Sequence, residues 1–142
     1  MTGLERLYRY AEENRVLVGT ERLQFAPAIT IRDNDKQDGE YYYVVIDPRQ
    51  IKSASTERET LMHELSHIAV GAFYTNQHDL RARRKIENRA LRWQIEHLIP
   101  KDQLMKAVAK GYTEPWELAE LFDVSQDLME KAMFYYQNGY IG

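Results

Sequence analysis

The sequence predicts an α+β fold in which a small antiparallel sheet is followed by helices. Two segments rich in β-branched and aromatic residues, "PAITIRD" and "EYYYVVID", flank the turn-forming stretch "NDKQDG". From Ser55 onward the apolar residues recur at helical spacing instead. At 142 residues, the chain is long enough for one domain with its own core, or for one domain with a small appendage.

The first part of the chain should form one helix and then strands. A short amphipathic helix is expected first, because apolar residues recur at helical spacing at Leu4, Leu7, Tyr8 and Ala11. Val16 and Val18 then begin the change to a strand pattern. We expect two or three antiparallel strands, of which residues 41–46 are the clearest, and Pro48 should end that run.

The second part should be helical throughout. Thr56 and Glu59 fit a capping box at the start of a helix that reaches about Phe73. A third helix is expected over residues 80–98, before Pro100. Shorter helices should follow over residues 104–110 and over "EPWELAELF", residues 114–122, and a last one from Ser125 to about residue 138. This pattern divides the chain into a core, residues 1–100, and a C-terminal helical subdomain, residues 101–142.

Composition excludes several classes of protein. The net charge of -3 is mild, so bulk charge indicates neither a nucleic-acid nor a membrane partner. The chain has no cysteine, which excludes disulfides and thiolate metal sites. The first residues, "MTGLERLYRYAEENR", lack the apolar region of a signal peptide, and no apolar run reaches about 18 residues. A soluble cytoplasmic protein is therefore expected.

The stretch "LMHELSHIAV" carries the clearest chemical signal. It places His63 and His67 four residues apart, with Glu64 beside the first histidine. On a helix such residues have Cβ atoms about 6 Å apart, so two imidazoles can bind one metal ion. Glu64 lies about 100° round the helix, where its carboxylate can take a proton from an activated water. The alternative is a pair of hydrogen-bonded core histidines beside a surface glutamate.

A third ligand must lie further along the chain. The extended pattern HExxHxxGxxH is excluded, because Val70 and Phe73 occupy its glycine and third histidine positions. The candidates downstream are His78, Asp79, Glu87, Glu96 and His97. Glu87 falls on the apolar side of the predicted helix 80–98, where a carboxylate needs a cation. It is the best candidate, although an ion pair with Arg83 is the alternative; His97 fits a core or ligand-supporting histidine better.

These residues resemble the ImmA/IrrE metallopeptidases of bacteria, phages and mobile elements. The first family motif corresponds to "HELSHIAV", and the second to Glu87, Ala90, Trp93 and the "LIP" that ends at Pro100. The resemblance extends over roughly residues 40–135. Leu91 and Gln94 depart from the usual family pattern, which leaves the subfamily and the substrate open.

The resemblance implies a zincin-like minimal metallopeptidase fold and a Zn²⁺ cofactor. It makes His63, His67 and Glu87 the zinc ligands and Glu64 the catalytic base. It further implies a cytoplasmic peptidase, common in phages, whose substrate is a helix-turn-helix repressor encoded nearby. In zincin-like folds an edge strand binds extended substrate, and we expect residues 41–46 to be that strand. Tyr74, His78 and His97 are positional candidates for stabilising the oxyanion.

The C-terminal segment "ELAELFDVSQDLMEKAMFYY" has the spacing of a helix-turn-helix. A tight turn is expected at Asp123, followed by a helix capped by Ser125. The second helix offers two acids and a single lysine, which disfavours contact with phosphate. A structural or protein-binding subdomain is therefore preferred to a DNA reader. The basic residues of the stretch 81–92 are interpreted as a solvated helix face.

Three functions are consistent with the sequence. The favoured one is a zinc-dependent endopeptidase, in which Glu64 accepts a proton from the attacking water and passes it to the leaving amine. The second is a binding module that keeps the metal for structure alone. The third is a DNA-binding regulator that uses the C-terminal helices. No membrane partner is expected, and nucleic acid is disfavoured.

Overall fold

The computed structural model describes residues 2–35, 39–71 and 79–141. Contacts divide the chain into two compact units, residues 1–71 and 72–142, which we call the N-terminal and C-terminal units. The expected α+β class is confirmed. Helix α3, which the sequence placed with the core, belongs to the C-terminal unit. The expected domain boundary near residue 100 stays a prediction.

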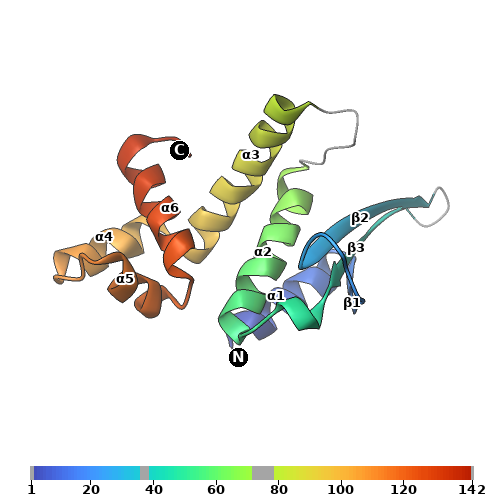
Figure 1. Ribbon diagram of the computed structural model, residues 1–142, viewed down its shortest axis with the longest axis horizontal. Coiled ribbons are helices and arrows are strands. Elements are labelled where there is room, and N and C mark those ends of the chain that lie inside the picture. Colours follow the sequence, from blue (N-terminus) through green and yellow to red (C-terminus); the bar gives the residue numbers. More distant parts are fainter. Residues whose placement is uncertain (1, 36–38, 72–78, 142) are drawn as a thin grey trace. The chain divides into compact units, whose positions relative to one another are not determined.

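The N-terminal unit combines two α-helices with a three-stranded sheet (Figure 1). Its elements in chain order are α1 (Gly3–Glu13), β1 (Val16–Thr20), β2 (Ala28–Asp35), β3 (Gly39–Ile46), the 3-10 helix η1 (Pro48–Gln50) and α2 (Ala54–Val70). Helix α1 begins with the capping box of Thr2 and Glu5, and Leu7 and Ala11 form its buried side. The amphipathic first helix is therefore present as expected.

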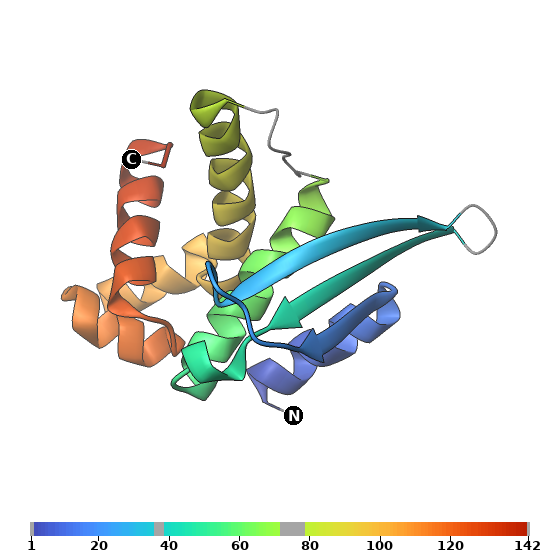
Figure 2. The same ribbon diagram turned by 45° about the vertical axis from the view of Figure 1, so that its right-hand side comes forward.

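The strand order is β1-β3-β2, which makes β3 the central strand (Figure 2). Strands β2 and β3 form the expected antiparallel pair, with Ala28 opposite Ile46. Strand β1 pairs parallel to β3, with Val16 opposite Tyr42, so the sheet is mixed and not wholly antiparallel. The expectation that residues 41–46 form an edge strand is wrong, because β3 has a neighbour on each side. The edges are β1 and β2.

The two faces of the sheet differ in burial. One face packs on α1 and α2, and its buried side chains are Val16, Ala28, Val44 and Ile46. On the opposite face Leu17, Ile29 and Ile31 are exposed. Successive side chains of a strand point to opposite faces. Thr30 therefore shares the helix-covered face with Ala28, between two exposed isoleucines.

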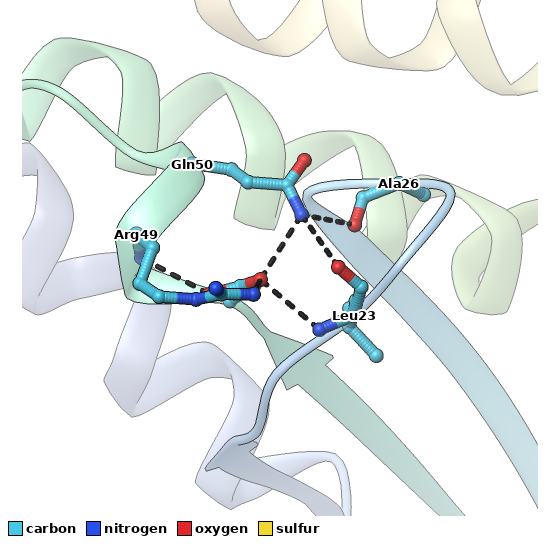
Figure 3. A network of polar contacts seen from close by, with 5 residues as sticks. Leu23, Ala26, Arg49 and Gln50 are labelled. Carbon is cyan, nitrogen blue, oxygen red and sulfur yellow. Dashed lines mark hydrogen bonds and ion pairs between the residues drawn. The ribbon is translucent and has the colours of Figure 1, made fainter.

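A polar network joins the segments that enter and leave the sheet (Figure 3). Asp47 is fully buried, caps η1 and forms an ion pair with Arg49 at 2.8 Å. Its carboxylate also accepts hydrogen bonds from the Leu23 backbone and from the Gln50 side chain, each at 3.0 Å. The same Gln50 amide donates to the carbonyls of Leu23 and Ala26. These contacts anchor the segment that leads into β2.

The C-terminal unit is helical: α3 (Leu80–Leu98), α4 (Lys101–Ala109), α5 (Pro115–Phe122) and α6 (Gln126–Asn138). Its core is one cluster of buried side chains drawn from all four helices and the α5–α6 turn, among them Ile95, Leu104, Leu118, Val124 and Met129. Asp123 adopts a left-handed conformation at the turn, with φ 54°, and the Ser125 side chain caps α6. The turn at Asp123 and the helix cap at Ser125 that the sequence predicts are thus present.

Candidate metal centre

Helix α2 presents the HExxH residues, and its ends are fixed by specific caps. The Ser53 hydroxyl accepts a hydrogen bond from the Thr56 amide at 3.1 Å, so the helix begins before Thr56. The expected capping box of Thr56 and Glu59 is therefore wrong, because Thr56 lies inside the helix. The helix ends at Val70, where Gly71 adopts the left-handed conformation with φ 63°. The expected extension to Phe73 falls outside the described residues.

His63 and His67 lie next to each other, one turn apart on α2. Their ring centroids are 5.0 Å apart with perpendicular planes, and they bring ligand nitrogens within 4.8 Å of each other. His67 is buried and His63 is half-buried, and Leu61 and Leu65 of the same helix are buried as well. The Ser66 hydroxyl donates to the backbone carbonyl of His63. Both imidazoles are thus placed where they can bind a common ion.

Glu64 is held by the sheet. It is half-buried, and its Oε2 atom accepts a hydrogen bond from the hydroxyl of Thr30 on β2. Sequence reasoning did not single out Thr30. The available signal was the alternation of "PAITIRD", which puts a hydroxyl on the same strand face as an alanine and between two isoleucines.

Glu87 lies on α3, in the C-terminal unit. It is half-buried, and Ala90 and Ile95 further along the helix are fully buried. Arg83, the alternative partner that the sequence offers for Glu87, is half-buried as well. Among the described residues, His63, His67 and Glu87 are a group that could hold a metal ion.

The other candidate ligands have different surroundings. Asp79 caps α3, accepting from the Ala82 amide at 2.7 Å. Glu96 is exposed and accepts from the Tyr135 hydroxyl at 2.6 Å. His97 is exposed and stacks on Trp93 with ring centroids 3.9 Å apart, so the expectation of a core histidine is wrong. Tyr74 and His78 lie outside the described residues.

The donor set fits a catalytic metal. Two imidazole nitrogens and one carboxylate oxygen form the three-ligand set that zinc peptidases use, and a fourth position remains for water or substrate. A glutamate adjacent to the first histidine of such a set can serve as the base. The chemistry of these four side chains is therefore that of metal-assisted hydrolysis.

Comparison with known proteins supports the same chemistry. The family model described as the IrrE N-terminal-like domain, of peptidase family M78, matches residues 15–134, which is most of the chain. No match was found among curated proteins or among solved structures. Within the described part of the chain, no helix is both long and apolar enough to cross a membrane. The chain belongs to the IrrE N-terminal-like family of M78 peptidases.

Proposed function

We propose that this protein is a zinc-dependent endopeptidase. The observation that carries the proposal is the group of His63, His67 and Glu87, which could hold a metal, in a chain of a peptidase family. In this proposal the three side chains are the zinc ligands and Glu64 is the catalytic base. Zinc is preferred because its catalytic sites use histidine and carboxylate ligands in this number.

A zinc ion held by His63, His67 and Glu87 would act as a Lewis acid, which would polarise the scissile carbonyl and lower the pKa of a water ligand to about 7. The remaining chemistry belongs to Glu64. Its carboxylate accepts the proton of the attacking water and then donates it to the leaving amine, which makes it a general base and then a general acid. The Thr30 hydroxyl donates to Oε2, so in this proposal the proton is exchanged at Oε1.

The substrate should bind along β2. Because β3 is central, the docking strand proposed from sequence must be replaced by an edge strand. Of the two edges, β2 contacts α2 and carries the threonine that bonds Glu64. An edge strand offers free N–H and C=O groups to an extended peptide. Flexible or partly unfolded segments should therefore be cut in preference to packed helices.

The family resemblance suggests the biological setting. We propose a cytoplasmic enzyme of a phage or mobile element that cleaves a helix-turn-helix repressor encoded nearby. A DNA-binding role for the C-terminal helices is disfavoured. On α6 the lysine Lys131 forms an ion pair with Asp127 at 3.1 Å, and Gln126 donates to Glu130 at 3.2 Å. Side chains that bond each other in this way are less available to phosphate.

The Glu64→Gln variant tests the proposal. It removes the base, keeps the side-chain shape and retains an oxygen that can accept from Thr30. We expect cleavage of an unfolded protein substrate to fall by at least about 100-fold. Zinc content, measured by elemental analysis, should stay at the wild-type level. A Glu64→Gln protein that binds a repressor substrate and cleaves it at the wild-type rate would refute the proposed peptidase mechanism. Loss of zinc from the variant would instead make Glu64 a ligand.

A further inference from the structure

Thr30 occupies an unusual place for a polar side chain. It lies opposite Val44, which is fully buried, and on the same strand face as the buried Ala28. Its neighbours Ile29 and Ile31 point to the other face and are exposed. Thr30 is half-buried, and its hydroxyl lies on the face of the sheet that α2 covers, where it donates to Glu64. A polar group at such a position requires a hydrogen-bond partner.

The hydrogen bond restricts both of its partners. Threonine is β-branched, so its χ1 angle has few choices on a strand and the hydroxyl is held in place. Glutamate has three rotatable side-chain bonds, and an unrestrained carboxylate samples many positions. Within the described residues, Thr30 is the side chain that hydrogen-bonds the Glu64 carboxylate. The hydrogen bond from Thr30 on the sheet thus fixes the position of Oε2. Because the carboxylate is rigid and planar, the bond also sets the direction in which Oε1 points.

We propose that Thr30 is a positioning residue for Glu64, an inference that rests on the peptidase function proposed above. Its hydroxyl holds Oε2 so that Oε1 faces the water and the leaving amine in one orientation. Displacement of a catalytic group by about 1 Å can reduce a rate about 100-fold. The side chain points to α2 and away from the strand edge, so loss of the hydroxyl lowers kcat and leaves KM nearly unchanged.

The test compares three substitutions in the full-length, zinc-loaded protein. Thr30→Val removes the hydroxyl and keeps the branched shape, whereas Thr30→Ser keeps the hydroxyl and loses a methyl group. Thr20→Val is the matched control, since it makes the same change at an exposed threonine of β1. For each protein, kcat and KM on an unfolded protein substrate, zinc content and the thermal unfolding midpoint are measured.

We expect Thr30→Val to lower kcat about 10- to 100-fold with KM within about twofold of wild type. Zinc content should be unchanged, and Thr30→Ser should restore most of the rate. Combining Thr30→Val with Glu64→Gln should give little further loss, because both act through one carboxylate. Should Thr30→Val fail to fold, Thr30→Ala replaces it and the comparison with serine still decides.

Two results overturn the inference. One is a wild-type kcat for Thr30→Val when Glu64→Gln is inactive. This result would refute the role of Thr30 and would leave the proposed peptidase function intact. The other is a Thr30→Ser protein as slow as the valine variant, which makes the residue a packing element. If Glu64→Gln itself cleaves at the wild-type rate, the proposed function fails first, so the two failures are distinguishable.

Discussion

His67 and His97 differ sharply in their surroundings. His67 is 8% exposed and its ring contacts that of His63, whereas His97 is exposed, with Nδ1 2.8 Å from the Trp93 carbonyl oxygen. A buried imidazole beside another imidazole suits a shared metal ion. An imidazole that is exposed and stacks on the half-buried indole of Trp93 has a local role that requires no metal. The two histidines therefore differ in their surroundings, although they are the same residue type.

This contrast predicts the effect of two alanine variants on metal affinity. Removal of a side chain that only hydrogen-bonds a metal ligand lowers metal affinity about 10- to 100-fold. His67→Ala removes a proposed ligand itself, so its zinc affinity should fall by more than this. His97→Ala should keep the wild-type affinity. Competition with a chelator, followed by elemental analysis, measures both. If His97→Ala releases zinc as readily as His67→Ala, the ligand assignment is wrong.

Sequence reasoning located most of the candidate site at this scale. His63, Glu64 and His67 were identified because a four-residue spacing puts two imidazoles on one side of any helix. Glu87 was selected because it falls on the apolar side of its helix. Thr30 was missed, since it lies 34 residues before the glutamate it contacts. Neither helical nor strand periodicity reports a contact between two elements so far apart along the chain.

At the scale of elements, the pairing of strands is what the sequence described least well. The β2–β3 pair was predicted, because two β-rich segments flank a turn. The place of β1 beside β3 was not, since parallel pairing joins segments that are not consecutive. For this reason the sequence placed residues 41–46 in an edge strand of the sheet. With β3 in the centre, a proline in place of Val44 should disrupt the sheet itself, because it removes a backbone donor from a strand paired on both sides.

The Asp47 network connects elements and predicts a dependence of stability on pH. Hydrogen bonds from Arg49 foremost, and from Leu23 and Gln50, hold the pKa of Asp47 below its ordinary value of about 3.9. A lowered carboxyl pKa contributes stability that is complete above the ordinary value. It is lost as pH falls through the folded-state pKa. The free energy of unfolding should therefore decrease in acid below about pH 4.

Asp47→Asn separates this contribution from other acid effects. We expect the variant to be less stable than wild type at pH 7, with a difference that narrows as pH falls below about 4. Denaturant unfolding of the metal-free proteins at pH 7 and pH 3 measures it, and removes any change in zinc binding. An equal difference at the two pH values would show that the Asp47 charge does not stabilise the fold.

At the scale of the whole molecule, the class of fold and the order of helices could be predicted. Apolar periodicity, the breaker Pro100 and the capping residues Ser125 and Gly139 determine local structure, and α3 has the bounds expected from sequence. Contacts group α3 with the C-terminal helices. Its buried Ile95 and neighbouring Ile99 join their core. Periodicity shows that a helix has an apolar side, but it does not show which core that side enters.

The central claim is that one zinc ion, held by His63, His67 and Glu87, is required for proteolysis. Titration of the metal-free protein with zinc, followed by cleavage of an unfolded protein substrate, tests it most directly. We predict no cleavage before zinc is added, and a rise that reaches its plateau at about one equivalent per chain. Glu87→Ala should need far more zinc or stay inactive. Full cleavage by the metal-free protein, or a Glu87→Ala titration identical to that of the wild type, would contradict the claim.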